Sequence, residues 1–258
     1  MSLLHVETAG QGRPLVLLHG WAMHAGLFTP LLPALVARHR VFAVDLPGHG
    51  HSAALPHWSL AAVVDALEAT FAHEGAIDVL GWSLGGLVAL AWARGHPQRV
   101  RRLVLVGTSP CFVAAADWPH AMAAGTLQRF ADELRVAYRP TLQRFLALQV
   151  QGSDAGKAAL AALRHALHAR GSPDPSVLSQ ALRVLGEADL RGEVAAIGAP
   201  SLLVAGERDA LVPVAAARWL AATLRHATLV EIAGAAHAPF LSHPDAFVAR
   251  LSDFLDAP

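Results

Sequence analysis

The chain has 258 residues, 54% of them hydrophobic, with 20 basic and 20 acidic side chains. This length suits one large α/β domain with an insertion, and a net charge of zero argues against the basic surface that general nucleic-acid binding needs. No apolar run approaches the ~20 residues that span a bilayer. The N-terminus lacks a basic segment followed by an apolar core, and Cys111 is the single cysteine. We therefore expect a cytoplasmic protein with no secretory signal and no internal disulfide.

Seven short apolar runs are typical of strands, and helical patterns lie between most of them. The predicted strands are Leu4–Thr8, Leu15–Leu18, Val41–Asp45, Ile77–Leu80, Leu103–Gly107, Leu202–Gly206 and Thr228–Ile232. The predicted helices between them are Leu60–Ala72, Leu84–Ala93, Ala215–Leu224 and Pro244–Leu255. Strands that alternate with helices predict an α/β fold with a mostly parallel sheet.

The alternation stops after Gly107 and resumes only near residue 191. Between Asp117 and Leu190 the patterns are helical, at Ala121–Tyr138, Thr141–Gln149, Ala155–Ala169 and Ser176–Leu185, with a break at Gly171–Pro175. We therefore expect a core of residues 1–116 and 191–258, with residues 117–190 inserted as a helical cap, or lid, above the carboxyl edge of the sheet. The alternative is a packing subdomain that does not touch substrate.

The segment Gly81-Trp82-Ser83-Leu84-Gly85 fits the Gly-x-Ser-x-Gly pattern of a nucleophile elbow. An apolar strand precedes it and a helical pattern follows. A sharp strand-to-helix turn exposes the serine hydroxyl, and glycines let the strand and the helix approach closely. The helix N-terminus also directs free N–H groups toward charge that forms beside the serine. The pattern therefore predicts Ser83 as a catalytic nucleophile.

A serine nucleophile needs a base, and the base needs an orienting acid; on folds with this elbow their chain order is Ser, then Asp or Glu, then His. Asp209 follows the strand that ends at Gly206, and His237 follows the last strand. Open α/β sheets bind ligands at the carboxyl ends of their strands. We predict His237 as the base and Asp209 as the acid, with Glu207 and Asp189 as rivals.

The second part of an oxyanion hole is expected after the first long strand, at His19-Gly20-Trp21. Gly20 allows a tight turn there. We assign the two donors as the backbone N–H groups of Trp21 and Leu84. His19 precedes the glycine, which favours a loop-bracing role over a catalytic one.

With these residues in place, the chain resembles the α/β-hydrolase family over nearly its whole length. The segments Asp45–Ser52, Ala199-Pro200 and Asp209–Pro213 match that family's loops. Narrower matches are Gly81–Gly86, Ser109–Phe112, Arg144–Gln149 and Ala235–Phe240. They resemble the carboxylesterases that hydrolyse the methyl ester of a pimeloyl chain on acyl carrier protein. The resemblance implies this substrate, release of methanol and a role in biotin synthesis.

The resemblance also implies which residues meet the substrate and the carrier. Phe145, Leu146, Ala147, Leu148 and Gln149 would line the substrate channel together with Ser83, Leu84 and His237, over a floor of Trp21, Met23 and Trp82. The alternative for Phe145, Leu146, Leu148 and Trp82 is plain core packing. Arg139, Arg144, Lys157 and Arg164 would dock the acidic carrier, or form an ordinary solvated face. Pro140, Gly156 and Ala161 stand where a denser basic ridge is expected.

We expect a monomeric serine esterase that needs no cofactor, and no metal site, since the histidines lack ligand spacing. Another esterase, lactonase, thioesterase or carbon–carbon hydrolase of the same fold would use the same triad. Dehalogenase chemistry needs a carboxylate nucleophile, so a serine at position 83 argues against it. A ligand receptor with poor turnover is the alternative outside enzymes.

Overall fold

The computed structural model describes residues 4–123, 125–171 and 173–257. Met1–Leu3, Ala124 in the predicted helix 121–138 and Ser172 in the predicted break lie outside the described residues. No helix in the described ranges is both long and apolar enough to cross a membrane.

A seven-stranded sheet forms the centre of the molecule, in the order β1-β3-β2-β4-β5-β6-β7. Its strands are β1 (Val6–Ala9), β2 (Arg13–Leu18), β3 (His39–Val44), β4 (Ile77–Trp82), β5 (Val100–Val106), β6 (Ser201–Gly206) and β7 (Ala227–Ile232). Only β1 is antiparallel to its neighbour. The central strands β4 and β6 are buried along their whole length, as strands covered on both faces must be, whereas the edge strands are half-exposed.

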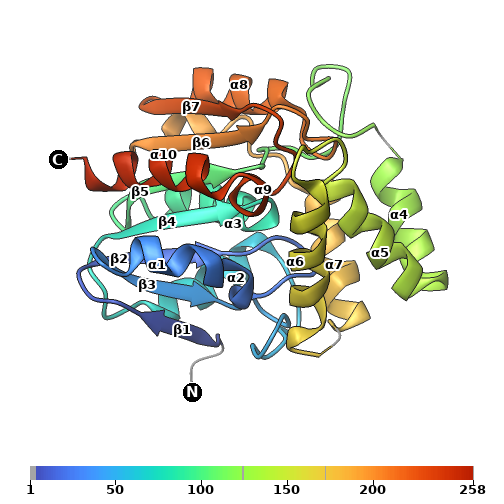
Figure 1. Ribbon diagram of the computed structural model, residues 1–258, viewed down its shortest axis with the longest axis horizontal. Helices are drawn as coiled ribbons and strands as arrows, with labels where there is room; N and C mark the ends of the chain where they lie inside the picture. The colour runs from blue at the N-terminus through green and yellow to red at the C-terminus, as the bar shows by residue number, and fades with distance from the viewer. Residues whose placement is uncertain (1–3, 124, 172, 258) are drawn as a thin grey trace.

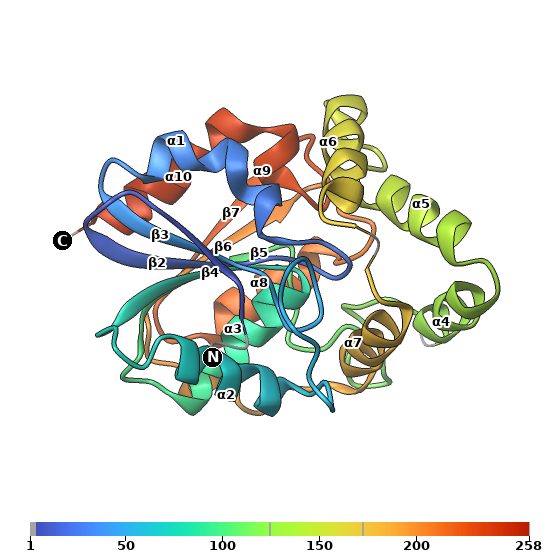
Figure 2. The ribbon, with the colours of Figure 1, turned by 90° about the horizontal axis from the view of Figure 1, so that it is seen from below.

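Helices cover both faces of the sheet. One face carries α1 (Leu32–Leu35) and α10 (Pro244–Asp256), and the other carries α2 (Leu60–Thr70), α3 (Leu84–Gly95) and α8 (Val214–Thr223) (Figure 2). Short segments complete the core: the 3-10 turns η1 (Ala25–Leu31) and η2 (Val194–Ala196), and α9 (Pro239–Ser242). The alternation of strands and helices therefore builds the predicted α/β fold, with the predicted strands and helices confirmed to within a few residues at their ends.

Four further helices form one group beside the sheet (Figure 1). They are α4 (Thr126–Val136), α5 (Tyr138–Gln149), α6 (Gly156–Ala169) and α7 (Pro175–Glu187), called here the four-helix insertion. Each of them buries an apolar face, for example at Leu134, Leu146, Leu163 and Leu178. Trp21 joins them to the core, since its indole N–H donates to the Leu178 carbonyl oxygen (2.9 Å). The insertion therefore lies beside the loops at the carboxyl ends of the strands.

Candidate active site

Ser83 occupies the turn between β4 and α3 with a strained backbone, at φ 54° and ψ −116°. Residues with a Cβ rarely adopt positive φ, so the surroundings must hold this conformation. The Ser83 N–H donates to the Val106 carbonyl oxygen (2.9 Å), and the Thr108 hydroxyl donates to the Ser83 carbonyl oxygen (2.7 Å). A Cβ on Gly85 would lie 2.2 Å from the Leu18 carbonyl oxygen, so only glycine fits there. The predicted elbow is therefore present.

His237 and Asp209 form a buried pair in the loops after β7 and β6. The imidazole Nδ1 lies 2.7 Å from Asp209 Oδ2, and each side chain is 1% exposed. The other carboxylate oxygen accepts the N–H groups of Leu211 (2.8 Å) and Val212 (2.9 Å). Because a carboxylate only accepts, Nδ1 carries the hydrogen, and Nε2 is left as a proton acceptor.

Gly107, at the end of β5, makes room for this pair. Its φ is +49°, and a Cβ would lie 2.9 Å from the His237 carbonyl oxygen and 3.2 Å from Nδ1. A side chain there would therefore push the imidazole away from Asp209. Gly107 was predicted only as the last residue of a strand, and a glycine at the end of a buried strand was the available signal for a place in the site.

The two rival acids have other partners. The Glu207 carboxylate accepts the Gly234 N–H (2.9 Å) and is 55% exposed. Asp189 pairs with the Arg191 guanidinium (2.6 Å), whose hydrogen bonds lower the pKa of this carboxyl below its ordinary value. Within residues 4–123, 125–171 and 173–257, Asp209 is the only carboxylate bonded to the His237 ring.

His19 braces the loop after β2. Its Nδ1 donates to the Gly20 carbonyl oxygen (2.8 Å), and its Nε2 accepts the Leu46 N–H (2.9 Å). Burial lowers the pKa of His19 to about 3, so the ring is neutral near pH 7 and keeps both bonds. The structure thus gives His19 the bracing position that was predicted for it.

The Trp21 and Leu84 N–H groups stand ready for an acceptor. Neither donates a hydrogen bond to any described residue. Leu84 begins α3, where free N–H groups are expected. Ala22, next to Trp21 in the loop after β2, has a positive φ of 64° and is a second strained residue.

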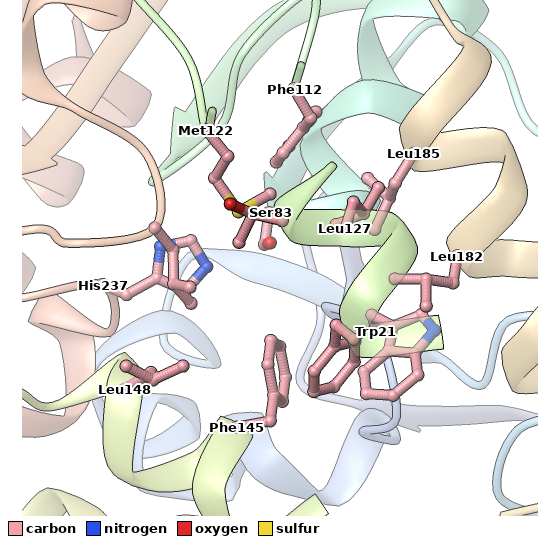
Figure 3. Close-up of a pocket in the computed structure, with 13 residues that line it drawn as sticks. Trp21, Ser83, Phe112, Met122, Leu127, Phe145, Leu148, Leu182, Leu185 and His237 are labelled. Carbon is pink, nitrogen blue, oxygen red and sulfur yellow. The ribbon is translucent and has the colours of Figure 1, made fainter. Parts of the chain in front are cut away.

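A cavity lined mostly by apolar side chains opens above Ser83 (Figure 3). Five of the predicted substrate residues line it: Trp21, Ser83, Phe145, Leu148 and His237. Eight further residues line it that were not predicted to contact substrate: Phe112, Met122, Thr126, Leu127, Phe130, Leu182, Leu185 and Leu211. Most of these residues come from α4 and α7. The sequence shows the helical periodicity of both segments, but it does not show which helix face turns toward the cavity.

Six predicted substrate residues are not among the described residues that line this cavity: Met23, Trp82, Leu84, Leu146, Ala147 and Gln149. Met23 lines a different cavity, beside Arg170. Trp82 is buried beneath His237 and donates its indole N–H to the His237 carbonyl oxygen (2.9 Å).

The α5 residues divide by helix face. Phe145 and Leu148, three apart, share the face toward the cavity, while Leu146 packs inside the insertion and Ala147 is exposed. Gln149 is buried, and within the described residues its amide atoms have no partner. The backbone carbonyl oxygen of Gln149 accepts the His237 N–H (3.0 Å). Gln149 thus contacts His237 through its backbone.

The four predicted docking residues, Arg139, Arg144, Lys157 and Arg164, are all exposed on α5 and α6. Arg144 pairs with Glu133 of α4. Leu148, one helical turn after Arg144, is 39% exposed although it lines the cavity. The cavity therefore reaches solvent at the end of α5, close to Arg144.

Comparisons with known proteins agree with this geometry. Residues 13–244 match the family model described as the α/β hydrolase fold. A pimeloyl-[acyl-carrier protein] methyl ester esterase from Chromobacterium violaceum is 47% identical over 253 residues, covering 98% of both chains. One from Nitrosomonas europaea is 43% identical, covering 96% of this chain and 98% of its own. An esterase structure from Exiguobacterium antarcticum has a TM-score of 0.90 at 22% identity, covering 98% and 96% of the two chains, a likeness of fold. The chain therefore belongs to the α/β-hydrolase family, within which the relatives from Chromobacterium violaceum and Nitrosomonas europaea are methyl ester esterases.

Proposed function

We propose that this chain is a serine esterase that hydrolyses the methyl ester of a pimeloyl chain carried by acyl carrier protein, in biotin synthesis. The observation that carries the proposal is the shared cavity: Ser83 and His237 both line it, and Asp209 holds the His237 ring from behind. The relatives from Chromobacterium violaceum and Nitrosomonas europaea support the choice of substrate. We propose the cytoplasm as the place where enzyme and carrier meet.

In the proposed mechanism Ser83 Oγ attacks the ester carbonyl carbon while His237 Nε2 takes its proton. Asp209 keeps the tautomer and stabilises the imidazolium. The N–H groups of Trp21 and Leu84 bind the oxyanion. The imidazolium then protonates the departing methoxide, and methanol leaves. Water, deprotonated by His237, cleaves the acyl-enzyme and regenerates Ser83 with a free carboxylate as product.

The lining of the cavity favours the neutral ester over the ionised product. His237 is the single ionisable side chain among the described residues that line it; the others are apolar or carry a hydroxyl. A buried carboxylate without a charged partner is costly, whereas a methyl ester is not. The cavity therefore supports binding of the ester and release of the acid.

In this proposal the four-helix insertion acts as a cap, with residues 117–190 as its extent. Phe145 of α5 and Phe130 of α4 pack against the Trp21 ring, with ring centroids 5.0 and 5.5 Å away. These contacts close the cavity above Ser83 and exclude water from the acyl chain. Arg144, one helical turn before Leu148, would meet the acidic carrier protein together with Arg139, Lys157 and Arg164, which are exposed on the same two helices.

The test is methanol release from pimeloyl methyl ester on acyl carrier protein, compared with a short p-nitrophenyl ester, with the Ser83→Ala variant as the blank. We expect kcat/KM to favour the carrier-bound ester. Preference for the short ester with no benefit from the carrier would indicate a general esterase. Absence of turnover on both would indicate a ligand receptor and would refute the proposal.

A further inference from the structure

Arg208 links the insertion to the loop that holds Asp209. Its backbone immediately precedes Asp209, but its side chain reaches the segment between α5 and α6, residues 150–155, called here the connector. One guanidinium nitrogen donates to the Gly152 carbonyl oxygen (2.9 Å) and to the Asp154 carboxylate. Arg208, the neighbour of the proposed acid, is thus bonded to Asp154 of the insertion, which lies 54 positions earlier in the chain.

The connector is also bonded to the loop that carries His237. The Asp154 N–H donates to the Gly234 carbonyl oxygen (3.0 Å), and the Glu207 carboxylate accepts the Gly234 N–H (2.9 Å). The Arg208 N–H donates to the Ala235 carbonyl oxygen (2.8 Å). The connector, the Asp209 loop and the His237 loop therefore form one hydrogen-bonded cluster.

Directly before the connector, α5 presents Phe145 and Leu148 to the cavity. The α5 end is held by the bond from the His237 N–H to the Gln149 carbonyl oxygen and by the Arg208 contacts. The ring contacts of Phe145 with Trp21 and Phe130 are apolar and include no directional hydrogen bond. The position of the α5 end over Ser83 therefore depends also on the polar contacts made beside the acid.

We infer that Arg208 is a positioning residue, which holds Phe145 and Leu148 in place over Ser83 by tying the connector to the Asp209 loop. The inference rests on the proposed function, because it takes the cavity as the acyl site. An acyl chain long enough to reach Phe145 and Leu148 depends on Arg208, whereas an acetyl group does not.

The test compares Arg208→Ala with wild type on p-nitrophenyl esters of acetate and of a seven-carbon acid. We expect kcat/KM for the longer ester to fall about five-fold, mainly through KM, as loss of an exposed charged contact allows. The acetate ester should change less than about two-fold. Arg218→Ala removes another exposed arginine–carboxylate pair, the one between α8 and Glu231 of β7 (2.7 Å), which makes no contact with the connector, and should change neither ester. Equal losses on both esters, or equal behaviour of the two variants, would overturn the inference.

Two further measurements identify the contact itself. The double variant Arg208→Ala with Asp154→Ala should lose no more kcat/KM for the longer ester than Arg208→Ala alone, because both substitutions remove the same interaction. The exchanged pair, Arg208→Asp with Asp154→Arg, should recover most of that loss. Additive losses without recovery would contradict the inference.

Hydrogen exchange tests the contact without any substrate. The Asp154 and His237 N–H groups should exchange faster in Arg208→Ala than in the wild type, and at the wild-type rate in Arg218→Ala. This readout separates failure of the inference, which is unchanged exchange, from failure of the proposed function, which is absence of ester turnover.

Discussion

The carboxyl edge of the sheet and the four-helix insertion build the two sides of the cavity in different ways. At the edge, short loops fix each polar group through buried hydrogen bonds, as at Asp209, whose two oxygens accept three of them. On the insertion, apolar side chains of α4, α5 and α7 line the cavity, and the charges face solvent. In the proposed function the chemistry therefore belongs to the sheet edge and the fit to substrate to the helices, so variants of the two regions should fail differently.

The largest effect is expected at the edge, from removal of the nucleophile. Ser83→Ala should lower kcat by roughly six orders of magnitude, as loss of a triad serine can. The fold should persist, because one hydroxyl is removed and the strained turn is held by backbone bonds. Hydrolysis at the wild-type rate by a folded variant, checked by circular dichroism, would refute the assignment.

The acid ranks second. Asp209→Asn should lower kcat by roughly 10⁴ because an amide stabilises the wrong tautomer of His237. The control is Glu207→Gln, two residues away, which keeps an oxygen to accept the Gly234 N–H and should change kcat far less. Asp189→Asn should also have little effect, since Asp189 pairs with Arg191. Steady-state kinetics with one short ester decide among the three carboxylates.

The sequence predicts some features of these two regions and not others. The difference depends on whether a feature is set by residues close in the chain or by contacts between distant ones. The strands were predictable because buried parallel strands read as continuous apolar runs. The grouping of Ser83, Asp209 and His237 was predictable because loops after such strands meet at one edge of the sheet. The segment η1 and α1 was missed because Pro30 and Pro33 interrupt its helical pattern. The contact of Arg208 with Asp154 joins residues far apart in the chain and leaves no local signature.

The cavity lining shows the same limit on the insertion. Periodicity places Phe145 and Leu148 on one face of α5, and both do line the cavity. It does not say which of the faces of α4 and α7 turn toward Ser83, so Leu127 and Leu182 were not identified. That choice is made by tertiary packing, such as the Trp21 indole bond to the Leu178 carbonyl oxygen.

A third effect concerns stability, because the histidines of the sheet edge and of the insertion differ in burial. At the edge, burial lowers the pKa of His19 to about 3 and of His49 to about 4, whereas His165 on α6 is exposed. Between pH 6.5 and about 4 the unfolded chain protonates both buried rings and the folded chain does not. Stability should therefore fall as the pH drops through this window, by about 1.4 kcal/mol per pH unit for each ring.

Urea unfolding at several pH values measures this slope. His49→Gln replaces this ring, whose Nδ1 contacts the Pro47 carbonyl oxygen at 3.1 Å, with an amide that does not titrate, and should reduce the slope by the share of one ring. His165→Gln, the exposed control, should leave it unchanged. An unchanged slope in His49→Gln would mean that this ring is protonated in the folded state.

The smallest effect is expected from the charges of the insertion, and it depends on the substrate. Charge reversal of Arg144 and Lys157 should raise KM for the carrier-bound ester several-fold, since such contacts act mainly on association. It should leave kcat/KM for a short free ester nearly unchanged, because neither residue lines the cavity. Salt screens exposed charges over ~8 Å at physiological strength, so added salt should narrow the gap between variant and wild type.

The matched control is Arg183→Glu on α7, whose arginine is exposed and paired with Glu187 (3.1 Å), much as Arg144 is paired with Glu133. If only the α5–α6 surface docks the carrier, Arg183→Glu should leave both substrates unaffected. Equal losses on carrier-bound and free esters would mean that reversal at Arg144 disturbs the packing of α4 against α5. Loss with Arg183→Glu alone would move the docking surface to α7, and would imply that the acyl chain leaves the cavity between α4 and α7, past Leu127 and Leu182, instead of past Leu148.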